Sequence, residues 1–344
     1  MKKSFKKTFF GLFIIIPSIF LVFFYITYNK ATPFKEGDFL DVSPGESLNS
    51  VIISLQDEYG FDKSFQTKFI MRLLSIEDNI TIGRHDLSNV RTIKDLTNNL
   101  TSATIYTSIT LLEGWSINEI SKYLSNHKDL QIFNENVFKQ KCHDLDFIKN
   151  DLIDDMGFYS VKSLEGFLFP ETYKVDSYVT EENLIKIFVE EYLDQTKYLR
   201  EDIDNIYKTM IIASIIEAET NNVDEMDTIS SVYNNRIKKG MLLQADPTVL
   251  YYMTEKDLRK FKNSKPGTKA FGSVWKKYKK MDNPYNTYKY ILPAGPINSP
   301  GIDAIKAAIN PARTSHLFMV MNNKLGRHLF SDNEKDHLRN IRRN

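Results

Sequence analysis

Two glutamates end a strongly apolar run in this sequence. Glu217 and Glu219 close the stretch TMIIASIIEAET, Thr209 to Thr220. Burying a charged carboxylate costs several kcal/mol unless the charge is paired or neutralised. The run therefore belongs either to a core helix whose acids lie at its solvent-exposed end, or to a site that holds an acid with a raised pKa.

The helical period predicts different surroundings for the two acids. At roughly 100° per residue, Ile212, Ile215 and Ile216 share one face of a helix, and Glu219 falls in the middle of that face. We therefore expect Glu219 to point inward and to need an internal partner. Glu217 lies on the side of this helix that carries small residues, so we expect it to face a cleft bordered by apolar side chains. Desolvation there would raise its pKa and keep it protonated near neutral pH.

The composition is that of an ordinary globular protein, with 42% hydrophobic and 26% charged residues among 344, a length that favours two or three domains. A net charge of +1 argues against a general nucleic-acid binder, which would carry a clustered basic excess. A single cysteine, Cys142, excludes an intramolecular disulfide. One cysteine and six histidines without an H-x-x-x-H pair lack the spacing of a zinc site, so we expect no metal.

The N-terminus predicts a membrane anchor. A tail with four lysines, residues 1–8, precedes the uncharged run FFGLFIIIPSIFLVFFYITY, residues 9–28. Such a helix, rising about 1.5 Å per residue, matches a hydrocarbon core of ~30 Å. The run is longer than the apolar part of a signal peptide, about 7–15 residues, and no A-x-A cleavage site follows. By the positive-inside rule the tail stays in the cytoplasm. The helix is followed by a linker at residues 29–37, and the rest of the chain then lies on the extracytoplasmic (periplasmic) side of the cell inner (cytoplasmic) membrane.

A small α+β module follows at residues 38–105. The stretch FLDVSPGESLNSVIISLQ predicts a strand, a Pro-Gly turn and a helix with Leu48, Val51, Ile52 and Leu55 on one face. A second helix, SFQTKFIMRLLS, and another strand, turn and helix come next. This order resembles the LysM-like module that binds glycan chains, and a spacer domain is the alternative.

The larger part of the chain, residues 106–344, contains the motifs whose side chains could form a binding or catalytic site. A strand leads to LLEGWS and to a helix whose capping box is Ser116 and Glu119. The stretch EGFLFPETY, Glu165 to Tyr173, is either a buried aromatic loop or a surface suited to the apolar faces of sugar rings. The motifs of residues 205–344 then include LLQADPTV, NPYNTYKY and the rigid loop LPAGPINSPG, followed by a helix over IDAIKAAI and a strand over SHLFMVMN.

These stretches, in this order, resemble the endolytic murein transglycosylases (MltG/YceG-like family). The resemblance covers nearly the whole chain after the anchor and includes ASIIEAET, VYNNRIKKGMLLQADPTVLY, NPYNTYKYILPAGPINSPG, AAINPARTSHLFMV and GRHLFSDNEKDH. Two departures are mild: Ala294 stands where a second proline is often found, and Ala218 where a lysine is common. The resemblance implies an α+β fold with an N-terminal transmembrane helix, the LysM-like module and a larger YceG-like catalytic domain.

The resemblance also implies a reaction and an acid. The family cleaves the β-1,4 bond between N-acetylmuramic acid and N-acetylglucosamine in peptidoglycan without water, and the product ends in a 1,6-anhydro ring. Its motif places the catalytic glutamate at the first acid, which is Glu217 here. Glu217 would protonate the glycosidic oxygen and then take the proton of the muramyl C6 hydroxyl. No cofactor is implied.

Two other functions stay open. A hydrolase of the muramidase type would need a second carboxylate near the first. The candidates for that carboxylate are Glu165, Glu171, Glu219 and Asp246. The other alternative is a scaffold that binds glycan through the LysM-like module and recruits partners without catalysis.

The remaining motif residues receive supporting roles. We expect Glu219 to hold a loop or the surroundings of Glu217 and to belong to the substrate-binding residues, with catalysis by Glu219 itself as the alternative. Substrate contacts are expected from Gln244, Asp246, Asn286, Thr287, Tyr288, Glu171 and Tyr173, each with packing or turn formation as the alternative. His328 and His337 are expected to be structural. The implied partners are peptidoglycan strands, the membrane and peptidoglycan synthases.

Overall fold

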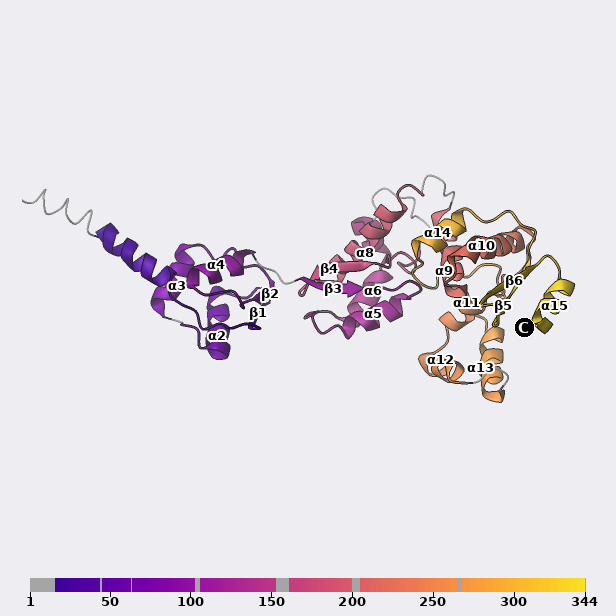
Figure 1. Cartoon of the computed structure of the whole chain (residues 1–344), viewed down its shortest axis with the longest axis horizontal. Helices are drawn as coiled ribbons and strands as arrows, with labels where there is room; N and C mark the ends of the chain where they lie inside the picture. Colours follow the sequence, from indigo (N-terminus) through magenta and orange to yellow (C-terminus); the bar gives the residue numbers. More distant parts are fainter. Residues whose placement is uncertain are drawn as a thin grey trace, which may run out of the picture. The chain divides into compact units, whose positions relative to one another are not determined.

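The computed structural model describes residues 16–43, 45–62, 64–102, 106–152, 161–199, 205–264 and 268–343. The chain divides into two compact units. Figure 1 shows the helices and strands, coloured by their position in the sequence. Unit 1 comprises Met1–Ser108, Lys128–Ile132 and Lys174–Val179, and unit 2 comprises Ile109–His127, Phe133–Tyr173 and Thr180–Asn344. Both units mix helices with short strands, as the sequence predicts.

Unit 1 follows the expected order of strand, two helices, strand and helix. Its elements are β1 (Phe39–Val42), α2 (Leu48–Tyr59), α3 (Phe65–Leu73), β2 (Gly83–Asp86) and α4 (Ile93–Ser102). Strands β1 and β2 are antiparallel, with Leu40 opposite His85. The predicted face of α2 is confirmed, because Leu48, Val51 and Leu55 are buried in the core of this unit. Burial of that apolar stripe, and not helix propensity alone, holds so short a helix in place.

The predicted membrane segment is described only from residue 16, and residues 9–15 lie outside the described residues. The described part is helical over 16–28 and exposes large apolar side chains, among them Ile19, Leu21 and Ile26. In the part of the chain that the structure describes, no helix is both long enough and apolar enough to cross a membrane.

The next elements lead into unit 2. They are β3 (Tyr106–Thr110), α5 (Ile117–Ser125), α6 (Glu135–Cys142), α7 (Leu145–Phe147), the π-helix η1 (Ile148–Leu152), β4 (Thr172–Asp176) and α8 (Glu181–Thr196). Strands β3 and β4 pair with each other. The predicted capping box of α5 is confirmed: the Ser116 side chain accepts from the Glu119 amide, and the Glu119 carboxylate accepts from the Ser116 amide.

The rest of unit 2 surrounds one buried helix, α9 (Ile206–Glu219). The later elements are α10 (Val223–Lys238), α11 (Asp246–Tyr251), α12 (Glu255–Lys262), α13 (Lys269–Lys280), α14 (Ile302–Ile309), β5 (Phe318–Asn322), β6 (Arg327–Ser331) and α15 (Glu334–Arg343). Helices α10, α11 and α14 pack against α9, whose residues Met210 to Glu217 are all buried (Figure 1). Strands β5 and β6 form an antiparallel hairpin covered by α15. The predicted helix at α14 and strand at β5 are confirmed.

Candidate active site

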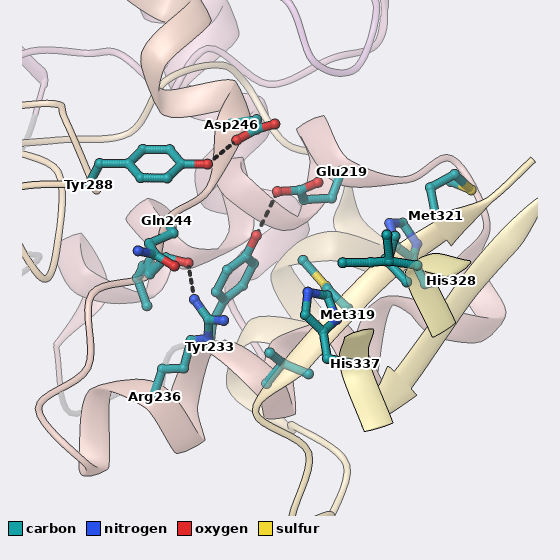
Figure 2. Close-up of a pocket in the computed structure, with 14 residues that line it drawn as sticks. Glu219, Tyr233, Arg236, Gln244, Asp246, Tyr288, Met319, Met321, His328 and His337 are labelled. Carbon is teal, nitrogen blue, oxygen red and sulfur yellow. Dashed lines mark hydrogen bonds between the residues drawn. The ribbon is translucent and has the colours of Figure 1, made fainter. Parts of the chain in front are cut away.

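A cavity of about 380 Å³ lies in unit 2, between the end of α9, the middle of α10, the segment before α11 and the β5–β6 hairpin (Figure 2). Its polar lining comes from Glu219, Tyr233, Arg236, Gln244, Asp246, Tyr288, His328 and His337. Apolar side chains of β5, Met319 to Met321, complete the wall. Two carboxyl groups therefore share one partly enclosed space.

Glu219 is the last residue of α9 and the carboxyl group that reaches the cavity from that helix. The hydroxyl of Tyr233, on the next helix, donates to Glu219 Oε1 at 2.6 Å, as Figure 2 shows. Burial raises the pKa of Glu219 to about 7, and the negative charge of Asp246 acts in the same direction. The hydrogen bond from Tyr233 and the charge of His328 act against this rise. The prediction that Glu219 has an internal partner is confirmed.

Asp246 begins α11 and forms a pair with Tyr288. The Tyr288 hydroxyl donates to Asp246 Oδ1 at 2.5 Å. Burial raises the pKa of Asp246, while the bond from Tyr288 and the positive charge of Lys279 oppose the rise. Gln244, two residues before, has a left-handed backbone with φ of 52°, which is uncommon for a residue with a Cβ atom. Residues in such strained conformations are enriched at functional sites.

Asn286 and Thr287 support this wall without lining the cavity. The Asn286 side-chain amide donates to the carbonyls of Lys279 and Met281 at 3.0 and 2.8 Å, and the residue is fully buried. Thr287 is also fully buried, and its Oγ1 accepts from the Ala245 amide at 2.9 Å. Both side chains fix the loop that carries Tyr288 and the turn before Asp246. Their predicted contact with substrate stays a prediction.

The two histidines come from the C-terminal elements and also line the cavity. His328 Nδ1 lies 2.9 Å from Glu225 Oε1, and its backbone amide donates to Glu225 Oε2 at 2.9 Å. The Thr220 hydroxyl donates to the same Glu225 carboxylate at 2.6 Å, so this carboxylate fixes the chain immediately after Glu219. His337 stacks on Phe318. The expected structural role fits the contacts of His328, although the residue also borders the site.

Tyr233 and Arg236 were missed by reasoning from the sequence. They lie three residues apart in VYNNRIKKG, and that spacing on one helical face was the available signal. The guanidinium of Arg236 donates to the carbonyls of Leu317, Leu242 and Leu243 at 2.6, 3.1 and 2.7 Å. Burial lowers its pKa. Arg236 thus contributes a fixed positive group to the lining of the same cavity.

Glu217 occupies different surroundings. It is 8% exposed and accepts a hydrogen bond from the Gly301 amide, at the start of α14, over 3.0 Å. Burial raises its pKa to about 7, the bond from Gly301 opposes this, and the charges of Glu113 and Asp303 add to it. It does not line the cavity described above.

The expected orientations of the two acids are therefore reversed. The loop that ends at Gly301 covers Glu217, whereas Glu219 stands where α9 leaves the core. Periodicity placed both on an ideal helix and took no account of where that helix ends or what covers its flank. The assignment of Glu217 as the catalyst stays a prediction, and the cavity offers Glu219 as its competitor.

The aromatic stretch from Glu165 to Tyr173 forms a packed loop. Tyr173 is 6% exposed, donates to the Phe169 carbonyl at 2.6 Å and packs on Phe188. Its ring is thus engaged in the core, in line with the packing alternative. Glu171 is exposed, and neither residue lines the cavity. The described residues contain no group of three or more His, Cys, Asp and Glu that could hold a metal ion.

Comparison with known proteins agrees with this architecture. The chain is 28% identical over 317 residues to an endolytic murein transglycosylase of Bacillus subtilis (strain 168), covering 87% of this chain and 82% of that relative. It is 28% identical over 185 residues to an endolytic murein transglycosylase of Streptococcus pneumoniae (strain ATCC BAA-255 / R6), of whose length it covers 32%.

A crystal structure of a yceG-like protein from Listeria monocytogenes superposes with a TM-score of 0.54 at 26% identity, covering 89% of this chain and 99% of that one. The model of the YceG-like family matches residues 40–343. This chain therefore belongs to the YceG-like family.

Proposed function

We propose that this protein is an endolytic murein transglycosylase. It cleaves the β-1,4 bond between N-acetylmuramic acid and N-acetylglucosamine in peptidoglycan strands and leaves 1,6-anhydro ends. Membership of the YceG-like family and the names of the Bacillus and Streptococcus relatives support this activity. The observation that carries it is a cavity that holds one carboxyl group with a pKa of about 7 beside a tyrosine hydroxyl and a second carboxyl group.

We place the chemistry on Glu219. In its protonated form Glu219 donates its proton to the glycosidic oxygen as the bond from that oxygen to muramyl C1 breaks. The muramyl C6 hydroxyl oxygen then bonds to C1, and the Glu219 carboxylate takes the hydroxyl proton. One group thus acts as acid and then as base, and a pKa near the working pH suits both steps. The bond from Tyr233 stabilises the carboxylate formed between them.

Asp246 and Tyr288 are placed to bind sugar hydroxyls, because their paired side chains form the cavity wall near Glu219. The same Asp246 favours one alternative, in which it activates a water and the protein hydrolyses the bond with two carboxyl groups. Glu217 holds the start of α14 in place through Gly301.

The test uses the full-length chain and uncrosslinked glycan strands, with mass spectrometry of the new ends. Wild-type protein is expected to give anhydro ends, and Glu219→Gln is expected to lower their rate of formation by roughly 10²–10⁴-fold. Glu217→Gln is the matched control: the same change, two positions away, is expected to keep the activity of the folded protein.

Three other results would contradict this proposal, and each would support a different assignment. Loss in Glu217→Gln with activity kept in Glu219→Gln would return the catalytic role to Glu217. New ends heavier by one water would identify the two-carboxylate hydrolase, and no cleavage by wild-type protein would favour the glycan-binding scaffold.

We further propose that residues 9–28 anchor the chain by a single pass in the cytoplasmic membrane, with the tail inside the cell and the catalytic part outside. The exposed apolar side chains of helix 16–28 and the flanking lysines support this. Retention of the chain in the membrane fraction after alkaline carbonate extraction is the expected result. Its recovery among soluble proteins would contradict the anchor.

Unit 1 is proposed as a LysM-like, glycan-binding module. Its β1–α2–α3–β2 order supports this, as does a cavity of about 560 Å³ whose lining includes Asn79, Thr81 and Thr101. Amide and hydroxyl groups bond sugar hydroxyls. The double variant Asn79→Ala/Thr101→Ala is expected to bind glycan strands more weakly. Unchanged binding would mean that unit 1 is a spacer.

Peptidoglycan synthases, which make these strands, are the proposed protein partners. Crosslinking of this protein to synthases in cells is the measurement that tests this.

A further inference from the structure

The hairpin of α12 and α13 concentrates positive charge. Between Glu255 and Lys280 the sequence has ten lysines and arginines against two acids, whereas the whole chain has a net charge of +1. Both acids are already paired, Asp257 with Lys277 at 2.8 Å and Glu255 with Arg259 at 2.9 Å. The remaining excess is therefore not neutralised by the acids of this hairpin.

One face of α13 carries three of these lysines. Lys276, Lys279 and Lys280 are exposed and lie at i, i+3 and i+4, so they share the outer side of the helix. The inner side is fixed, because Val274 and Tyr278 are buried in a small apolar cluster between the hairpin and α11. The three residues are called the lysine face below.

The lysine face begins at the wall of the cavity. Lys279 Nζ lies 4.0 Å from the centre of the Tyr288 ring, and the Trp275 ring meets the same tyrosine edge-on at 6.2 Å. Tyr288 in turn donates to Asp246 inside the cavity. The positive charge of Lys279 also acts on Asp246, where it opposes the rise in pKa that burial causes. One tyrosine ring thus separates the lysine face from the carboxyl groups of the site.

We propose that Lys276, Lys279 and Lys280 form a subsite for the carboxylates of stem peptides on the strand that occupies the cavity. This subsite rests on the proposed function. The sugar hydroxyls and acetamido groups of a glycan strand are neutral, and its negative charge lies on peptides that branch from the muramyl sugars. A muramyl sugar beside Tyr288 brings its own peptide to the lysine face. Lysines suit such mobile carboxylates, because each is a flexible point charge without a fixed geometry.

This subsite makes the protein prefer strands that still carry peptides over naked strands. The attraction is between exposed charges, so it weakens over a screening distance of about 8 Å at physiological salt and fades further as salt rises. Each such contact is weak by itself. The expected effect is therefore a graded loss of kcat/KM and not loss of the reaction.

The experiment compares three full-length proteins on two substrates. The proteins are wild type, Lys276→Gln/Lys280→Gln, which leaves Lys279 and its contact with Tyr288 intact, and the control Lys238→Gln/Lys239→Gln, which removes two exposed charges elsewhere in unit 2. The substrates are uncrosslinked strands with stem peptides, and the same strands after an amidase has removed the peptides and the lactyl carboxylates exposed by that cleavage have been converted to neutral amides. The first variant is expected to lose about 3- to 10-fold in kcat/KM on peptide-bearing strands only, with the loss disappearing at high salt.

The rate on naked strands shows that each variant is folded and able to cleave. Equal losses on both substrates, a similar loss in the control variant, or no loss at all would overturn the subsite while leaving the proposed function intact. Unchanged cleavage together with lost binding to vesicles of anionic lipid would assign the lysine face to the membrane and also overturn it. Absence of cleavage by wild-type protein on either substrate would instead reject the proposed function.

Discussion

The hydroxyl of Tyr233 influences how strongly Glu219 holds its proton. It donates to Glu219 Oε1 at 2.6 Å and so stabilises the charged carboxylate against the burial that raises the pKa to about 7. The acid form, which starts the proposed reaction, is lost as the pH rises through that value. The rate is therefore expected to fall above about pH 7.

Removing this hydroxyl is expected to move the fall in rate to higher pH. In Tyr233→Phe the carboxylate loses a donor, so the pKa of Glu219 rises further and the acid form survives longer. The pH profile of kcat/KM for anhydro-end formation measures the shift. Tyr290→Phe removes an exposed hydroxyl that bonds Asp282 and is the matched control. A profile that stays in place, or moves to lower pH, would rule out the acid role of Glu219.

The sequence identified the pair of acids but not their surroundings. Periodicity correctly gave Glu219 an internal partner, but it reversed the surroundings of the two acids, because Glu219 lines the cavity and Glu217 is buried. It could not show that the loop ending at Gly301 covers Glu217, since that contact joins residues 84 positions apart. Tyr233 and Arg236 were missed because their spacing on one helical face does not show what they contact, which is Glu219 for Tyr233 and the Leu317 carbonyl for Arg236.

At the scale of elements, local patterns were the most reliable guide. The capping box of α5, the buried face of α2 and the helix α14 each depend on residues within a few turns, and each is present. The aromatic loop EGFLFPETY left two interpretations open, and long-range packing decided for the buried one at Tyr173. Packing between distant segments is the information that a single sequence lacks.

Two rigid stretches meet at Gly166, which allows a prediction for the loop. Gly166 has φ of 87°, and a Cβ atom there would lie 2.7 Å from Pro296 Cβ. Gly166→Ala therefore combines backbone strain with a clash against a side chain that cannot rotate away, and a loss of about 2–4 kcal/mol in stability is expected. Gly240→Ala is the control, because Gly240 has φ of 67° but open space around it, so only about 1 kcal/mol is expected.

The thermal unfolding midpoints of the two glycine variants measure this difference. The structure requires Gly166→Ala to be the less stable of the pair. Equal midpoints would mean that the two stretches do not press against each other at this position.

For the whole molecule, a buried acid makes stability depend on pH. Glu165 is 2% exposed, and burial raises its pKa to about 7 against an ordinary 4.5, although bonds from the Tyr251 hydroxyl and the Ile117 amide oppose the rise. The folded chain thus holds a proton that the unfolded chain releases above about pH 4.5. The stability from this group is complete below that pH and is lost as the pH rises through about 7.

Glu165→Gln is expected to remove this dependence, because glutamine is neutral at every pH. Relative to wild type, the variant should gain about 3 kcal/mol in unfolding free energy between pH 4.5 and pH 8. Denaturant unfolding at several pH values measures the difference. Glu171→Gln, at an exposed site in the same loop, is the control and should run parallel to wild type. Parallel curves for both variants would show that Glu165 does not titrate in this range.

The three carbonyls held by Arg236 have a consequence for the newly made chain. Leu317 follows Arg236 by 81 positions, so the ribosome completes α10 long before the Leu317 carbonyl that Arg236 binds has been made. Until β5 and β6 are made, the cavity beside Glu219 lacks the wall that Met319, Val320, Met321 and His328 form. If Glu219 is the catalyst, as proposed, a half-synthesised copy is expected to be unable to cut the cell wall, because the last portion of the chain completes the site.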